Sequence, residues 1–321
     1  MATIRRYSPG EEARILELFN SSFPGGIVRT QASWLWRYAR HRYFDPDGVR
    51  VAEENGKIVG HIMGSVRRLL FRGQTATTVF GDDLCVLPEE RGKGLGRMLL
   101  TRLMRFAEEK QAVLMSYAGK DNVAHKICTS LGYSTVDEFV IMRGVGGRTP
   151  GSSGAIEHNH VPQSRNGLVV RRCLQEDIGR VVDFLNAANR EKIASPQLDR
   201  LEYEWRYLTY TNSSLNSVFL CEECGSVVGH VAVTSHPTSG EQQMVILSEP
   251  NGKIEGILDS LREPKAASVN AAVHDEDSVT YESFGFSPVA RGVVIVKNYS
   301  DLDILGASKW YLVPENIFGE P

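Results

Sequence analysis

The feature that most constrains this chain is a phrase that it contains twice. The segment AEENGKIVGH ends at His61 and the segment CEECGSVVGH ends at His230, so the copies lie 169 positions apart (230 − 61). Three further pairs of segments match in the same order, with offsets that drift as insertions and deletions would make them. Solenoid repeats have periods of about 20–50 residues, so this spacing is too long for one. The chain is therefore expected to contain a duplicated domain.

The other matches and the segment between them suggest where the domains lie. The matched pairs are RRYSPGEEARILELFN with RRCLQEDIGRVVDFLN, WLWRY with YEWRY, and TSLGY with ESFGF. Between the two sets lies GVGGRTPGSSGAIEHNHVPQSRNG, which is rich in Gly, Ser, Pro and Asn and has no hydrophobic period, as a linker would be. We expect a first domain at 1–143, a linker at 144–167, a second domain at 168–299 and a tail at 300–321.

Composition excludes several classes of function. The 321 residues carry a formal net charge of −3, so no basic excess favours nucleic-acid binding. No apolar run approaches the roughly 18 residues that span a bilayer, and the first 20 residues lack the apolar core of a signal peptide. A cytoplasmic protein is expected, with its oligomeric state open. The five cysteines are odd in number and scattered, and the lone C-x-x-C at Cys221 and Cys224 is more typical of a hairpin turn than of a zinc site, so no metal is expected.

Hydrophobic spacing predicts a mixed α/β fold in each half. The segment ARILELF has apolar residues at helical spacing, and LGRMLLTRLMRFAEEK has an apolar face typical of an amphipathic helix. The segment around Asn55-Gly56 indicates two strands joined by a tight turn. In the first half the predicted order is β-α-β-β-β-α-β-α-β, which favours a mixed sheet with helices on its faces.

A glycine-rich, basic turn between a predicted strand and a predicted helix carries the chemistry. In VLPEERGKGLGRMLL, glycines let several backbone N–H groups face one point, and the helix N-terminus adds the positive end of its dipole. The pattern is neither a Walker loop nor a dinucleotide fingerprint. It is R-x-x-G-x-G, at Arg91, Gly94 and Gly96, after a strand that ends V-x-P. This arrangement resembles the coenzyme A loop of the GCN5-related N-acetyltransferases, the GNAT superfamily.

The resemblance covers most of the first half, and it implies two tandem GNAT folds that use acetyl-CoA as co-substrate. The strand before the loop is expected to splay from its neighbour and to pair with the pantetheine arm, and the loop is expected to hold the pyrophosphate. Asn122 matches the asparagine that opens the next helix near the pantetheine, and it is equally suited to be an N-cap. The implied cofactor-binding residues are Leu84, Cys85, Val86, Leu87, Arg91, Gly92, Lys93, Gly94, Leu95, Gly96, Arg97 and Asn122.

Acyl transfer needs a base that takes a proton from the acceptor amine, and a buried carboxylate with a raised pKa is suited to this role. Family members often place an acid where Asp82 and Asp83 stand. Since adjacent strand residues face opposite ways, at most one is expected to face the amine. Either acid is equally suited to a solvated or capping role. His61 is a further candidate base, but its twin His230, in a half without the loop, favours a structural role for both.

The proton donor for the departing thiolate is unassigned. The family usually has a tyrosine four residues before the glycine of its G-F pair, whereas this chain has Cys128, which is either a weak donor or a buried helix residue. The segment SWLWRYARHRYF resembles the acceptor-side helical segment of some members. Trp34, Trp36 and Tyr38 are thus candidate substrate residues, and core packing is the alternative.

The second half has the opposite pattern. Tyr281 stands where the tyrosine belongs, but VILSEPNGKIEGILDSL lacks the loop and offers only Lys253 to a phosphate. The second half is expected to be a degenerate GNAT fold that walls the acceptor cleft of the first half or stabilises that half. The predicted function is acetyl transfer to a primary amine of a small molecule, catalysed by the first half. The alternatives are a non-catalytic acyl-CoA sensor or scaffold, and O-acyl transfer.

Overall fold

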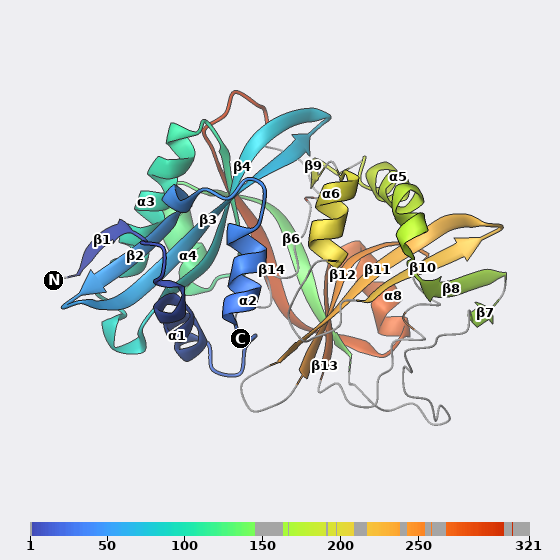
Figure 1. Ribbon diagram of the computed structural model, residues 1–321, viewed down its shortest axis with the longest axis horizontal. Helices are drawn as coiled ribbons and strands as arrows, with labels where there is room; N and C mark the ends of the chain where they lie inside the picture. Colours follow the sequence, from blue (N-terminus) through green and yellow to red (C-terminus); the bar gives the residue numbers. More distant parts are fainter. Residues whose placement is uncertain are drawn as a thin grey trace.

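A computed structural model describes residues 2–144, 163–165, 167–190, 192–196, 198–208, 217–237, 243–253, 258, 268–304 and 310. Most of the predicted linker and tail falls outside these ranges. In the described part, one sheet of 14 strands runs through both halves, and helices pack against its faces (Figure 1). Within the same ranges, no helix combines the length and the apolar character that a membrane crossing requires.

The first half has the predicted order of elements, with one addition. Between the first helix and the second strand, a short helix (α2) continues into a π-helical turn at Leu35–Ala39. Three-residue 3₁₀ turns lie at Pro46–Gly48 and Pro88–Glu90. The elements are β1 (Thr3–Arg6), α1 (Glu12–Ser22), α2 (Gln31–Trp34), β2 (Val49–Glu54), β3 (Lys57–Phe71), β4 (Gln74–Val86), α3 (Leu95–Glu109), β5 (Val113–Gly119), α4 (Val123–Ser130) and β6 (Ser134–Gly144).

The described residues of the second half follow this order and add two short strands, β7 and β9. Most of the segment at the position of α3 lies outside the described ranges. A second π-helical turn at Glu204–Leu208 follows α6, as in the first half. The elements are β7 (Gln163–Arg165), β8 (Leu168–Arg172), α5 (Ile178–Ala188), β9 (Ala194–Pro196), α6 (Arg200–Tyr203), β10 (Ser217–Glu223), β11 (Ser226–Pro237), β12 (Gln243–Gly252), β13 (Ser268–Val273), α8 (Ser278–Ser283) and β14 (Phe286–Asn298).

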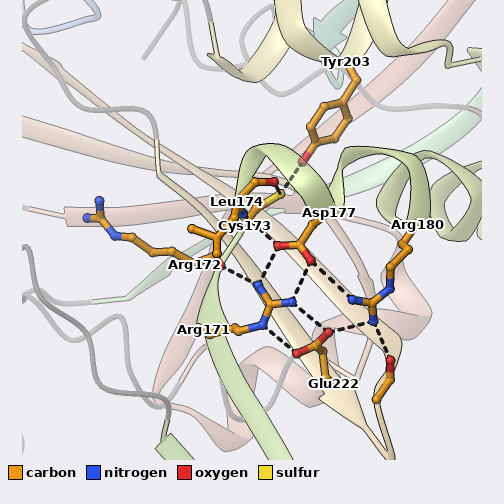
Figure 2. Close-up of polar contacts among 9 residues, drawn as sticks. Arg171, Arg172, Cys173, Leu174, Asp177, Arg180, Tyr203 and Glu222 are labelled. Atoms are coloured by element: carbon orange, nitrogen blue, oxygen red, sulfur yellow. Dashed lines mark hydrogen bonds and ion pairs between the residues drawn. The ribbon is translucent and has the colours of Figure 1, made fainter.

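The duplication extends to individual hydrogen bonds. Figure 2 shows the Arg171 guanidinium between the carboxylates of Asp177 and Glu222, to which it donates at 2.6–2.9 Å. Arg180 donates to the same two carboxylates and to a turn carbonyl. The equivalent network in the first half consists of Arg5, Glu11, Glu53 and Arg14, with the carbonyl of Gly56. Each network ties the first strand of its half to the following helix and hairpin.

The two copies meet through a pair of equivalent tryptophans. The rings of Trp36 and Trp205 stack with their centroids 5.1 Å apart and an interplanar angle of 15°. Each indole N–H donates to the backbone carbonyl of the other residue, at 2.8 and 3.1 Å. A contact in which each partner repeats the role of the other is the signature of a twofold arrangement, so the π-helical turns of the two halves face each other across a local twofold.

At the join, the two halves exchange strands. The strand order there is β5-β14-β6-β13, so β14 of the second half lies between two strands of the first, and β6 of the first half pairs with β13 of the second. The short β9 adds a further crossing by pairing with the end of β3. The predicted limits at 143 and 168 therefore mark positions in the sequence, while the strands on either side of them belong to one continuous sheet.

Candidate functional site

The site lies in a fork between two parallel strands. Strands β4 and β5 pair only over Thr78–Gly81 and Val113–Ser116, although β4 continues to Val86 and β5 to Gly119. Beyond this short ladder the strands separate, and a cavity of about 170 Å³ lies there. Its lining residues are Phe19, Phe23, Gly81, Asp82, Asp83, Leu84, Tyr117, Ala118, Gly119, Asn122, Ala124, Phe139, Ile141, Ala290, Arg291 and Gly292.

A β-bulge brings both predicted acids to this cavity. Met63 pairs with Asp82 and His61 with Cys85, so that Asp83 and Leu84 together stand opposite one residue of β3. Asp83 has a φ of +50°, and a bulge of this kind interrupts the alternation of side chains. Both acids therefore line the cavity, and the alternation on which the expectation of a single inward-facing acid rested is interrupted at this point.

The surroundings of the two carboxylates push their pKa values apart. Asp82 is 6% exposed, accepts a hydrogen bond from Ser65 Oγ at 3.2 Å, and lies 3.9 Å from the Arg37 guanidinium. Burial dominates and raises its pKa to about 6. Burial also opposes ionisation of Asp83, but the charges of Arg29 and Arg37 and the Tyr38 hydroxyl lower the pKa of Asp83 below its ordinary value.

Asp82 is thus the acid that can take and release a proton near neutral pH, whereas Asp83 stays ionised. Such a divergence within a pair of carboxylates marks a division of acid–base roles. The Oδ1 atom of Asp82 is buried and has no hydrogen-bond partner within the described part of the chain.

The three predicted substrate residues have different surroundings. Tyr38 donates its hydroxyl to Asp83 Oδ2 at 2.5 Å, and burial holds the pKa of this phenol well above its usual value. Trp36 lies between the two halves, and Trp34 packs in the core against Tyr38 and neighbouring rings. Tyr38 is therefore in contact with a cavity-lining acid, while none of the three lines the cavity itself.

His61 supports the bulge. Its Nδ1 atom lies 3.2 Å from the carbonyl oxygen of Asp83, and burial lowers the pKa of His61 to about 4. A neutral imidazole protonated on Nδ1 donates to this carbonyl and holds the backbone of the bulge in place. Its twin His230 is also fully buried, 3.4 Å from the Tyr203 hydroxyl. Both positions agree with the structural role expected for the twin histidines.

The glycine-rich loop presents backbone amides at the start of α3. Gly92 and Gly94 have φ values of +81° and +80°, which glycine adopts without strain. Gly94 is the N-cap of α3, and no side chain caps the helix there, so the first-turn amides remain available to an anion. Leu95 is buried and anchors the helix start in the core, while Gly96 in the first turn is partly buried. The loop fits the pyrophosphate of a coenzyme A molecule.

The charged side chains of the loop already have partners. Arg91 donates to the carbonyls of Val86 and Ser22, at 3.2 and 3.4 Å, and so ties the loop to β4 and to the end of α1. Lys93 pairs with Glu90 at 2.7 Å, and Arg97 donates to Ser130 Oγ at 2.7 Å. Arg91 thus shapes the loop, and the backbone amides with the helix dipole are its main anion-binding elements.

The end of β4 turns an edge to the fork. The amide of Leu87 donates to the carbonyl of Val59 in β3 at 3.0 Å, and Cys85 pairs with His61 in the same strand. Because backbone groups alternate along a strand, those of Val86, beyond the bulge, are directed away from β3, and its carbonyl accepts from Arg91. This edge fits an extended arm with amide groups, such as pantetheine.

Two further predicted residues differ in their relation to the cavity. Asn122 lines it, and its Oδ1 accepts from the amide of His125 at 2.8 Å, so the helix cap and the cavity position coincide. Cys128 is 3% exposed in the apolar core and is absent from the cavity lining. Burial raises the pKa of its thiol to about 12. The reading of Cys128 as a buried helix residue fits this position, and we assign it no part in proton transfer.

Sequence reasoning missed the residues that surround the acids. Arg29 and Arg37 lie beside Asp83 and Asp82, and the backbone of β14 at 290–292 forms one cavity wall. The second half contributes a buried histidine, His236, to this region. Burial, together with the charges of Arg29 and Arg37, lowers the pKa of His236 to about 3. Arg37 has a twin at Arg206 in the repeat, which was an available signal. Nothing local in the sequence indicates which strand β14 joins.

Other contacts of the second half involve the segment that follows Arg37 and Tyr38. His41 Nε2 lies 3.5 Å from the Glu202 carboxylate, and Arg42 pairs with Asp199 at 2.8 Å. Among the described residues, no group of three or more His, Cys, Asp or Glu side chains is arranged as a metal site.

Comparisons with known proteins find a family model that matches part of the first half. Residues 13–133, which run from α1 to just beyond α4, match the model of the acetyltransferase (GNAT) family. Among curated proteins, none matches the chain in sequence.

Solved structures share the fold over nearly the whole chain. N-myristoyltransferase of Saccharomyces cerevisiae with bound myristoyl-CoA aligns with a TM-score of 0.69 and 13% identity, covering 98% of this chain and 86% of that one. A GCN5-related N-acetyltransferase from Anabaena variabilis aligns with a TM-score of 0.60 and 10% identity, covering 94% and 73%. At these identities the alignments establish the fold.

Proposed function

We propose that the chain is an acyl-CoA-dependent N-acyltransferase that transfers an acetyl group to the primary amine of a small molecule, since residues 13–133 match the model of the acetyltransferase (GNAT) family. The observation that carries the proposal is the fork, where a carboxylate with a pKa of about 6 and an ionised carboxylate line one cavity. The second half is proposed to be a degenerate GNAT fold.

Acyl-CoA supplies the reaction with an activated thioester. In the proposed binding mode, the amides that follow Gly94 bind the pyrophosphate, and the edge of β4 that faces the fork holds the arm. The fork then places the acyl carbon beside Asp82 and Asp83. A backbone amide at the end of β4 stabilises the negative charge that develops on the carbonyl oxygen.

Asp82 is the proposed base. At neutral pH it is ionised, and it takes the proton that the acceptor ammonium must lose before its nitrogen can attack. The C–N bond forms, the C–S bond breaks, and the electron pair of that bond leaves on sulfur. The second proton of the nitrogen neutralises the departing thiolate or is released to water. Asp83 keeps its negative charge and attracts the positively charged acceptor to the cavity.

The size of the cavity supports a short acyl group. Pockets for drug-sized ligands have volumes of about 300–1,000 Å³, whereas this one has about 170 Å³. The structural neighbours include a protein with bound myristoyl-CoA, a long acyl chain. Aromatic rings, among them those of Tyr117 and Phe139, line the cavity in this chain and favour an acetyl group.

The second half is proposed to close the acceptor side of the cleft. Trp205 stacks on Trp36 one residue before Arg37, and Glu202 contacts His41 in the segment that carries Tyr38. These contacts fix the segment that supplies the hydroxyl and guanidinium partners of the two acids. A second half that serves as a wall needs the surface that contacts the first half, and it does not need a glycine-rich loop. This role therefore explains why the second half keeps that surface and lacks the loop.

The test is release of free thiol from acetyl-CoA in the presence of a broad panel of amines and alcohols, with product identified by mass spectrometry. Multiple turnovers with an amine support the proposal. Turnover only with a hydroxyl acceptor indicates O-acyl transfer. Calorimetric binding of coenzyme A without product from any acceptor indicates a sensor or scaffold.

A further inference from the structure

One of the aromatic rings that line the cavity lies against the exchanged strand β14. Phe139 in β6 is 1% exposed and lines the cavity. Its register partner in the exchanged strand β14 is Gly292. A Cβ atom placed on Gly292 would lie 2.1 Å from the ring of Phe139, far inside van der Waals contact. The ring therefore lies directly on the backbone of β14, in space that only a glycine leaves open.

The surrounding residues hold this ring in place. Tyr117 in β5 meets it edge-on, with centroids 6.1 Å apart and an interplanar angle of 80°. Tyr117 in turn stacks on Phe80 of β4 at 6.3 Å. Phe139 also belongs to the apolar core cluster that contains Val294 and Met115. Such close packing leaves a buried ring little room to move aside.

The two acids and the ring of Phe139 come from different strands. Asp82 and Asp83 come from β4, whereas Phe139 and Ile141 come from β6, which is separated from β5 by β14. An acyl group whose carbonyl carbon lies in the fork near the acids has its hydrocarbon tail available to the apolar lining on β6. Beyond the ring of Phe139 lies packed core.

We propose that Phe139, seated on Gly292, determines the longest acyl chain that this site accepts. The ring fills the space into which a longer chain would extend. The inference rests on the proposed function, since it takes this cavity as the acyl site. A smaller side chain at this position lengthens the cavity along β14.

The test compares the wild type with Phe139→Ala and Phe139→Leu. The assay is kcat/KM for thiol release from acetyl-, butanoyl-, hexanoyl- and octanoyl-CoA with one acceptor, together with calorimetric binding of the same thioesters. In the wild type both quantities are expected to decline beyond the shortest chains. In Phe139→Ala the preferred chain becomes longer, and each newly buried methylene improves binding about fourfold. Phe139→Leu shifts the preference by less.

A matched control separates cavity length from loss of core packing. Phe71 belongs to the same core cluster, contacts Trp310, and does not line the cavity. Phe71→Ala should lower stability and keep the wild-type preference for chain length. Circular dichroism shows which variants are folded, and Phe139→Leu provides the answer if Phe139→Ala does not fold.

Two results would overturn the inference. One is a folded Phe139 variant whose chain-length preference equals that of the wild type. The other is a wild type that binds octanoyl-CoA as tightly as acetyl-CoA. If no acceptor supports thiol release, the proposed function fails, while the calorimetric series still shows whether the ring limits the chain.

Discussion

Replacing Asp82 by asparagine removes a buried charge while keeping the shape of the side chain. The pKa of Asp82 rises from 3.8 to about 6 in the folded protein. The folded state therefore holds this proton more tightly than the unfolded chain, and ionisation of Asp82 costs stability that grows as the pH rises from about 4 to 6. The difference of about 2 pKa units (6 − 3.8) corresponds to about 3 kcal/mol above pH 6.

Asp82→Asn is accordingly expected to be about 3 kcal/mol more stable than the wild type at pH 8, with the gain disappearing below about pH 4. Its activity should change in the opposite direction. In the wild type, kcat/KM falls about tenfold per unit below pH 6, where Asp82 is protonated, and is level above it. The variant should lose about 10²–10⁴ in kcat together with this acid limb. Urea denaturation across this pH range and rates from pH 5 to 9 measure both effects.

Asp83→Asn is the matched control, since it removes the neighbouring charge. The charges of Arg29 and Arg37 and the Tyr38 hydroxyl lower the pKa of Asp83, so its ionised form stabilises the fold above the unfolded pKa. This variant should therefore be less stable than the wild type at pH 8. An Asp82→Asn protein that is less stable at pH 8, or that keeps an acid limb near pH 6, would refute the assignment of Asp82 as base.

Three further substitutions test other parts of the structure. Gly94→Glu places a negative side chain at the uncapped start of α3 and at a φ of +80°, so calorimetry should detect no coenzyme A binding in a folded protein; retained affinity would place the anion elsewhere. Trp205→Ala removes the stack on Trp36 and the hydrogen bond from its indole N–H to the Trp36 carbonyl, which should lower the free energy of unfolding by about 3–5 kcal/mol and reduce kcat; unchanged kcat would argue against a role of the second half at the site. Arg171→Gln leaves Arg180 as the charged partner of Asp177 and Glu222, which should cost about 1–3 kcal/mol in urea denaturation with kcat unchanged, and a fall in kcat would contradict a purely structural network.

Features encoded by neighbouring residues could be predicted from the sequence. The turn at Asn55-Gly56 needs two residues that tolerate positive φ, and both have it, at +50° and +76°. The apolar spacing of Leu95–Glu109 predicts the helix whose leucines face the core. The repeated phrase marks hairpins that occupy the same place in each half. The order of elements in the first half follows from such local signals.

Features that depend on partners distant in the sequence could not be predicted. At the bulge, Asp83 and Leu84 of β4 lie opposite a single residue of β3. Neither of them is a glycine, which would have signalled a bulge in the sequence. Alternation alone therefore assigned only one acid to the cavity. Arg37 lies on a π-helical turn, and nothing in its local pattern indicates that it faces Asp82. Residues 290–292 line the cavity because β14 lies between β5 and β6 of the first half. No short segment of the sequence indicates this exchange of strands.

The exchanged strand also has a consequence for the order in which the protein matures during synthesis. Domains generally fold as their residues leave the ribosome, from the N-terminus onward. Here β5 and β6 have no strand between them until Phe286–Asn298 has been made. The glycine-rich loop, both acids and Phe139 are translated long before, yet the cavity wall at 290–292 arrives only with β14. A ribosome-bound chain that stops short of β14 therefore carries all the proposed catalytic residues of the first half without a closed site, and acyl transfer becomes possible only after both halves have been made.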